Sequence, residues 1–293
     1  MANFIMIRYK DMKYPEDIPC EISEIAGHFD KKGFKKVFTQ NTKYSLHTEY
    51  SFGKRTLDSE LLDDLDEIKW STKNGIPKLW KSQVWAKEFF YFIERLLGDS
   101  IPEIIEIHPP FVDYCNSIGE FLDIYETFER LVLDKYKHTK IFIENRCGTL
   151  YGKRFTISKF SDIITLCKKL HERNLKLNIV LDYPQLMSSE RINSKNNSLN
   201  KLVGFNNEIK NYIEYFGGIH LWGKKKINNR LTSHHGNLDT LFNNVSQKDI
   251  FLESILNTFR DKDIMYMVLE VNSNVIDLHS IIDDLRNHGF MFI

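Results

Sequence analysis

The chain has 293 residues, of which 42% are hydrophobic, and its 40 Lys and Arg residues balance 40 Asp and Glu residues. This apolar content supports a substantial core and excludes a disordered chain. Proteins that hold nucleic acid by charge alone usually carry a basic excess. The zero net charge therefore argues against a purely electrostatic DNA binder, although it allows a locally basic active site.

The cysteines and the N-terminal residues bear on the expected location of the protein in the cell. The four cysteines are scattered without a C-x-x-C pair, which favours a reducing environment over a disulfide framework. Residues 1–10 contain a short apolar run followed by charge, and no apolar stretch approaches membrane-spanning length. We expect a cytoplasmic protein that is not associated with a membrane.

The first third of the chain predicts an irregular start to an α/β fold. Two strand-like runs, Lys36–Thr39 and Tyr44–Glu49, lie too close together to be parallel neighbours, which need a crossover of a dozen residues or more. The sequence thus leaves seven or eight strands open. The other elements expected here are a strand at Phe4–Arg8 and helices at Ile18–Lys32, Asp58–Ile68 and Ser82–Leu97.

The rest of the chain alternates apolar runs with helical patterns. Continuous apolar, β-branched runs suit strands buried on both faces, as in a parallel sheet. Apolar residues at three- and four-residue steps after Ile118 and after Phe160 predict helices that cover such a sheet. The expected strands are Glu103–His108, Lys140–Glu144, Leu177–Asp182, Gly218–Leu221 and Met265–Glu270.

The spacing of these runs predicts a single (β/α)₈ TIM barrel over residues 1–293. The polar residues that end the first four runs follow one another at steps of one βα unit, with a longer last step to Glu270. No linker or low-complexity tract divides the chain, and strand–helix alternation is typical of parallel α/β folds.

In such a barrel, catalytic residues lie at the carboxyl ends of the strands. Each of the five strands predicted after residue 100 has, at its end or next to it, a residue that can bind a metal. Any one of them alone would more often be a helix cap or a loop residue, but four consecutive strands ending in Glu, Asp, His and Glu are an improbable coincidence. Histidine and carboxylate ligands suit Zn²⁺ or Mn²⁺. The candidate ligands are Glu144, Asp182, His220 and Glu270, with His108 and His47 beside them.

The order of these residues resembles the xylose-isomerase-like TIM-barrel superfamily, which includes sugar isomerases and epimerases, endonuclease IV and the UV-damage endonucleases. The similar motifs run from about residue 44 to residue 272. They are S-L-H47-T-E-Y, I-E-I-H108-P-P, I-F-I-E144-N-R, I-V-L-D182-Y-P-Q, G-I-H220-L-W, S-H234-H235-G-N-L and V-L-E270-V-N.

The resemblance implies a metal core of Glu144, Asp182, His220 and Glu270, as in the sugar isomerases. It also implies a second ion that Glu144 shares with His47 and His108, as in the nucleases. The chain departs from the nuclease pattern of a third site. Gln185 replaces a histidine there, and Thr232 replaces the aspartate of the Asp-x-His motif that would include His234. UV-damage endonucleases prefer a lysine where this chain has Gly218.

The loops after two of the strands are basic, which suits a phosphate in DNA or on a sugar, although such runs are also common in solvated loops. Trp222 could stack on a base or sugar ring, or simply pack at the barrel rim. We expect His234, rather than His235, to act in catalysis with Glu144 and Glu270. The expected substrate-binding residues are Trp222, Lys224, Arg230, Arg146 and Lys153.

The sequence is compatible with two enzymatic functions and with a third possibility in which the protein is not an enzyme. An endonuclease IV-like hydrolase would cleave a phosphodiester with one or two divalent ions, and the number of histidines favours it. A sugar or sugar-phosphate isomerase or epimerase would use a single ion while Glu144 or Glu270 moves a proton, and the zero net charge favours that reading. The third possibility is a barrel kept as a binding module without chemistry.

Overall fold

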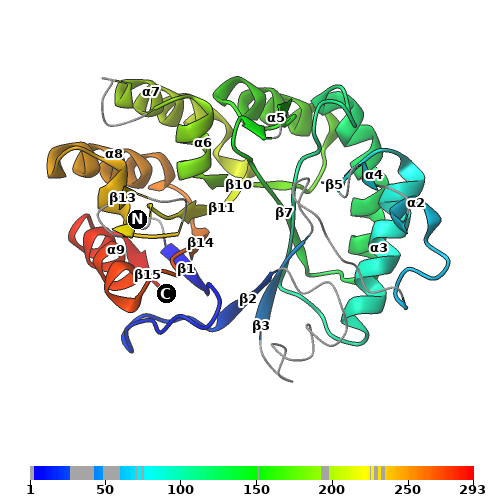
Figure 1. Ribbon diagram of the computed structural model, residues 1–293, viewed down its shortest axis with the longest axis horizontal. Helices are drawn as coiled ribbons and strands as arrows, with labels where there is room; N and C mark the ends of the chain where they lie inside the picture. The colour runs from blue at the N-terminus through cyan, green and yellow to red at the C-terminus, as the bar shows by residue number, and fades with distance from the viewer. Residues whose placement is uncertain are drawn as a thin grey trace. The chain divides into compact units, whose positions relative to one another are not determined.

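The structure is a computed structural model that describes residues 3–26, 43–48, 60–69, 72–73, 76–150, 152–192, 198–224, 226–227, 230–231 and 235–293. These residues fall into two compact units (Figure 1). Unit 1 comprises Met1–Ser23 with Ile179–Ile293, and unit 2 comprises Glu24–Asn178.

Unit 2 contains three parallel strands, with β6 (Ile104–Ile107) between β3 (Lys43–His47) and β7 (Lys140–Glu144). The residues of the middle strand, Ile-Ile-Glu-Ile, are mostly β-branched, which favours the strand conformation. They are also mostly apolar, and the strand is buried along its whole length, as is usual for a parallel strand inside a sheet. Helices α3 (Gln83–Leu97), α4 (Ile118–Lys135) and α5 (Phe160–Arg173) follow the strands in alternation, and α3 packs beside α4 (Figure 1).

The helices of unit 2 begin at caps and enclose an aromatic core. Ser82 and Ser117 accept hydrogen bonds from the first turns of α3 and α4. Fully buried aromatic side chains fill the space between these two helices. The small elements of the unit are α2 (Asp66–Lys69) and the hairpins β4–β5 (Thr72–Lys73, Ile76–Pro77) and β8–β9 (Thr149–Leu150, Lys153–Arg154).

Unit 1 contains five parallel strands in the order β10, β11, β14, β1 and β15. Their bounds are Asn178–Asp182, Phe216–Leu221, Ile264–Leu269, Asn3–Arg8 and Met291–Phe292. The helical elements are α6 (Tyr183–Ser189), α7 (Leu199–Ile209), η1 (Lys210–Tyr215), η2 (Leu238–Leu241), α8 (Val245–Phe259) and α9 (Val275–Asn287). A short hairpin joins β12 (Lys226–Ile227) to β13 (Arg230–Leu231).

The strands and helices predicted after residue 100 are confirmed with small shifts at their ends, whereas two predictions in the first third are wrong. The predicted helix Ile18–Lys32 contains strand β2 (Ile22–Ala26), whose first residues pair with β1. Its isoleucines three residues apart also fit a helical period, but pairing with a neighbouring strand decides the conformation. In the predicted helix Asp58–Ile68, residues 60–65 form turns, and helix α2 begins only at Asp66.

Of the two adjacent strand-like runs, Tyr44–Glu49 corresponds to β3, and Lys36–Thr39 lies outside the described residues. Within the described part of the chain, no helix has the length and apolar character required to cross a bilayer. The assignment of residues 1–293 to one domain stays a prediction.

Candidate metal centre

In unit 2, three adjacent strands present four potential ligands. His47 ends β3 and Glu144 ends β7, while Glu106 lies on β6 and His108 directly follows it. Glu106 and His108 are two residues apart, so their side chains point to the same face of the strand. The register places His47 opposite Glu106, which brings the ligands of β3 and β6 to the same level.

The four side chains of this cluster converge on a small volume. One ligand atom from each lies within 4.8 Å of the others, and all four residues are buried. The Nε2 atom of His108 is 2.8 Å from His47 Nε2 and 2.8 Å from Glu144 Oε2. Glu106 Oε1 lies 3.7 Å from His47 Nε2. Two imidazoles with two carboxylates form a donor set that fits Zn²⁺ or Mn²⁺. We name these residues the unit 2 cluster.

Glu24 sets the tautomer of His47. Its Oε1 lies 2.6 Å from His47 Nδ1, and an ionised carboxylate can only accept a hydrogen bond. A neutral His47 therefore carries its proton on Nδ1 and keeps a lone pair on Nε2, which faces the cluster. Carboxylates that hold metal-binding histidines in this way raise the basicity of the ligand.

The surroundings of the unit 2 cluster shift the pKa values of His108 and Glu144 toward a neutral imidazole and an ionised carboxylate. Burial lowers the pKa of His108 to about 4, and the nearby His47 and Arg146 act in the same direction, against Glu144. Burial alone would raise the pKa of Glu144, but the Arg146 guanidinium and the two histidines hold it well below its usual range. Arg146 donates to both oxygens of Glu144, at 3.3 and 3.2 Å. A neutral imidazole and an ionised carboxylate are the forms that bind metals.

Unit 1 contains a second set of potential ligands, which we name the unit 1 trio: Asp182, His220 and Glu270. Asp182 ends β10, His220 lies opposite it on β11, and Glu270 directly follows β14. Their ligand atoms lie within 4.8 Å of one another, and all three residues are buried. His220 Nδ1 is 3.3 Å from Glu270 Oε1. The strand ends of each unit thus gather ligands as the sequence predicts. The sharing of one ion between Glu144 and the unit 1 trio stays a prediction.

Gln185 and Trp222 orient the carboxylate of Asp182. Its Oδ2 accepts hydrogen bonds from the Gln185 side-chain amide at 2.6 Å and from the Trp222 indole at 3.0 Å. Its Oδ1 accepts one from the backbone N–H of Gln185 at 2.9 Å, so Asp182 is also the N-cap of α6. These three hydrogen bonds fix the orientation of the Asp182 carboxylate, as partners of a metal-binding carboxylate commonly do.

The other predicted site residues lie in varied surroundings. Trp222 is buried beside Asp182, Arg146 belongs to the unit 2 cluster, and Lys153 forms an ion pair with Asp113. Lys224 is exposed, and Arg230 lies on β13. Their contacts with substrate stay predictions. His234, predicted to be catalytic, lies outside the described residues.

Sequence reasoning gave little weight to His235, which contacts Glu270. Its Nδ1 is 2.7 Å from the Glu270 carbonyl oxygen, and its ring stacks on Tyr9 with centroids 5.6 Å apart. The backbone of His235 has a φ of 72°, a conformation that histidine adopts more readily than most residues. The pair of adjacent histidines, His234 and His235, marks this loop as a candidate in the sequence, but the motif position favours His234 over His235.

Sequence reasoning also missed Glu24 and Glu106. Glu24 lies in the segment Ile18–Lys32, which the sequence predicts to be a helix. That prediction gives no reason to expect Glu24 beside His47. Glu106 had a usable signal, because polar residues two apart in a buried strand share one face.

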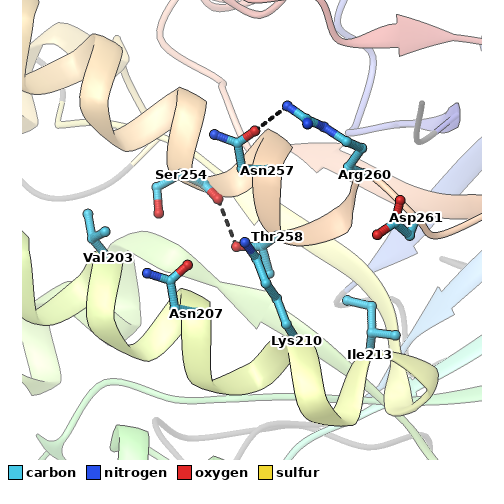
Figure 2. Close-up of a pocket in the computed structure, with 9 residues that line it drawn as sticks. All are labelled: Val203, Asn207, Lys210, Ile213, Ser254, Asn257, Thr258, Arg260 and Asp261. Carbon is cyan, nitrogen blue, oxygen red and sulfur yellow. Dashed lines mark hydrogen bonds between the residues drawn. The ribbon is translucent and has the colours of Figure 1, made fainter.

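The cavity in Figure 2 belongs to unit 1 and lies away from the unit 1 trio. It has a volume of about 480 Å³ and lies between the α7–η1 segment and the end of α8, among residues that include Lys210, Arg260 and Asp261. These segments lead into the amino ends of β11 and β14, whereas the unit 1 trio lies at carboxyl ends. Arg260 donates to Asn257 at 2.5 Å. The cations here complement the negative end of α8.

Comparison with known proteins finds similarity in structure only. No family model and no curated protein matches the sequence. A D-tagatose 3-epimerase-like protein is similar over 97% of both chains, with a TM-score of 0.52 and 13% identity. A xylose isomerase domain protein from Planctomyces limnophilus covers 98% of this chain and 96% of its own, with a TM-score of 0.49 and 12% identity.

A family 2 AP endonuclease from Brucella melitensis covers 97% of this chain and 99% of its own, with a TM-score of 0.47 and 11% identity. The predicted fold class and the resemblance are confirmed at the level of fold. The chain has the (β/α)₈ TIM-barrel fold, which it shares with the D-tagatose 3-epimerase-like protein.

Proposed function

We propose that the protein is a divalent-metal enzyme that hydrolyses phosphodiester bonds in nucleic acid. The observation that carries this proposal is the presence of two buried ligand sets, one in each unit. A one-ion isomerase needs only one such set, whereas two-metal sites are common among phosphatases and nucleases.

The residues of each set have separate tasks. The unit 2 cluster would hold one ion through its two imidazoles and two carboxylates, and the unit 1 trio would hold another. When bound, a divalent ion supplies Lewis acidity and acidifies a water molecule. Glu24 holds His47 in the tautomer suited to a ligand, and Arg146 keeps Glu144 ionised. Asp182 is oriented by Gln185 and Trp222.

The proposed substrate carries phosphate, and DNA is the first candidate. The basic residues predicted on the loops after β7 and β11 would bind its phosphates, with Lys224 exposed and Lys153 half-buried. Because the net charge is zero, binding would depend on these local cations rather than on a general attraction to nucleic acid.

The second candidate is a sugar isomerase or epimerase that uses one ion. Its support is the zero net charge of the chain, which gives no general attraction to nucleic acid. The epimerase-like protein found by structural comparison also has this fold. In that reaction Glu144 or Glu270 would transfer the proton.

Metal content and product chemistry separate the two candidates. Elemental analysis of the native protein should find two ions per chain, and each of His108→Asn and His220→Asn should lose one. The native protein should nick duplex DNA that contains an abasic site. Glu144→Gln should abolish nicking, while Glu126→Gln, at an exposed position of α4, should leave it unchanged.

One ion per chain, no nicking and incorporation of solvent deuterium into a ketose would instead support the isomerase or epimerase. A protein that binds no metal, or whose function is indifferent to Glu144→Gln, would contradict both enzymes and support a binding module.

A further inference from the structure

Trp80 makes an unusual contact with the backbone of a candidate ligand. Its side chain is completely buried, and its indole Nε1 donates a hydrogen bond of 2.7 Å to the carbonyl oxygen of His108. The backbone of Trp80 has a φ of 60°, the left-handed region that bulky residues rarely adopt. Such conformations cost about 1–2 kcal/mol and persist where the surroundings enforce them, often beside functional sites.

The segment after β6 contains two prolines, so it has few backbone N–H groups with which to bond its neighbours. Pro109 and Pro110 follow His108, and proline has no N–H with which to bond a neighbouring strand. The described contacts therefore hold the segment by its carbonyl groups. Trp80 bonds the carbonyl of His108, and Thr156 bonds that of Pro110 through its backbone N–H at 3.0 Å and its hydroxyl at 2.6 Å.

Trp85 lies beside Trp80 in the same aromatic core and offers a matched comparison. Trp80 packs edge-on against Trp85, with ring centroids 5.2 Å apart, and against Phe121 and Phe128 at 5.4 Å. Trp85 belongs to the same cluster and is only 2% exposed, yet within the described part of the chain its Nε1 has no hydrogen-bond partner. Among the described residues, the two indoles thus differ in this one contact, the hydrogen bond from Trp80 to the backbone of His108.

We propose that Trp80 is a positioning residue for metal binding: it fixes the His108 backbone so that the imidazole meets His47 and Glu144. This inference rests on the proposed function, because it assumes that the unit 2 cluster binds an ion. Partners that orient a ligand commonly contribute about 10- to 100-fold in metal affinity.

Two matched variants test the proposal. Trp80→Phe and Trp85→Phe each replace a buried indole in one aromatic core, but only the first removes a hydrogen bond to the cluster. Both are made in a His220→Asn background, so that the remaining ion reports on the unit 2 cluster. Zn²⁺ affinity is measured by chelator competition and stability by urea unfolding. Trp80→Phe should weaken Zn²⁺ binding about 10-fold or more, and Trp85→Phe less than about twofold.

A second measurement uses the wild-type protein and does not depend on the folding of any variant. Coupling is reciprocal, so if breaking the bond weakens Zn²⁺ binding about 10-fold, Zn²⁺ must suppress opening of the bond about 10-fold. Hydrogen exchange at the Trp80 indole, followed by NMR, should slow by that factor when Zn²⁺ is added, beyond any change at Trp85.

The possible outcomes separate the two proposals. If both variants weaken Zn²⁺ binding equally, or if Zn²⁺ slows the two indoles alike, Trp80 is a core residue and only this inference fails. If the parent protein binds no Zn²⁺ at the unit 2 cluster, the inference and the proposed function fail together.

Discussion

Glu24 lies behind the candidate ligand His47 and controls which of its nitrogens carries the lone pair that faces the cluster. The carboxylate accepts the Nδ1 proton at 2.6 Å, so the lone pair on Nε2 is directed toward His108 and Glu144. An amide in its place could still accept this proton, but it would no longer bring a negative charge that raises the basicity of the imidazole.

We therefore expect Glu24→Gln to weaken Zn²⁺ binding by about 10-fold, the lower end of the effect usual for such partners. Chelator competition measures the affinity, and Glu126→Gln, an exposed change of the same kind, serves as the control. An affinity equal to that of the control would show that Glu24 does not act on the ligand.

For single residues, the sequence predicts every candidate ligand of the two sets except Glu106, but it does not predict the residues that support them. His108, Asp182 and Glu270 follow apolar runs, and the ends of parallel strands meet on one side of a sheet. Glu24 and Trp80 act through contacts between segments distant in sequence, and no local pattern marks such contacts. Gln185 was noted only as a departure from the nuclease pattern, yet it bonds both oxygens of Asp182.

At the scale of elements, prediction succeeded where strands are continuous apolar runs and failed where pairing decided the conformation. Strand β7 was predicted with its observed bounds, Lys140–Glu144, because its run of apolar residues ends at a charged one. Strand β2 was predicted to be helical, since Ile22 and Ile25 fit both periods and only the neighbouring β1 selects the strand.

A buried lysine connects three elements of unit 1. Lys248 on α8 bonds Asp239 of η2 at 2.5 Å and Asp284 of α9 at 2.7 Å, and its side chain is only 9% exposed. Burial alone would lower the pKa of Lys248, but the two carboxylates outweigh it and raise the pKa. Removing the lysine would leave the carboxylate of Asp284, which is 19% exposed, without its cation.

We expect Lys248→Met to lower the free energy of unfolding by about 2 kcal/mol, because breaking a buried pair leaves an uncompensated charge. Adding Asp284→Asn should recover part of this loss. Lys135→Met, which breaks an exposed pair with Glu94, should cost less than about 1 kcal/mol. Urea unfolding of the four proteins measures these values, and an equal loss for the buried and exposed lysines would contradict the prediction.

For the whole molecule, alternation of strands and helices predicted the (β/α)₈ class, and spacing of about one βα unit supported it. The sequence could not give the number of early strands, because two candidate runs lie within a few residues of each other. Composition predicted a folded chain with no net charge near pH 7. At that pH, stability therefore depends on individual buried charges more than on overall repulsion.

The buried imidazole of His108 makes the stability of the metal-free protein depend on pH. The pKa of His108 is about 4 in the folded protein, and an ordinary histidine has a pKa of 6.5. Between these values the unfolded chain binds a proton that the folded protein excludes, so stability falls as the pH is lowered. The lowered pKa of Glu144 affects stability only at lower pH. Its contribution to the free energy of unfolding is complete above the usual glutamate pKa of 4.5 and is lost as the pH falls below that value.

In the presence of a chelator, His108 should therefore reduce the free energy of unfolding by about 2 kcal/mol between pH 7.5 and pH 5, while Glu144 contributes little to that change. Urea unfolding at both pH values measures the loss. His108→Gln should remove about 2 kcal/mol of this pH dependence, whatever its effect at pH 7.5, whereas His138→Gln, at an exposed position after α4, should retain it. If His108→Gln and the wild type lose the same free energy over this range, then His108 is protonated in the folded protein. It would then be unsuited to bind a metal at pH 5.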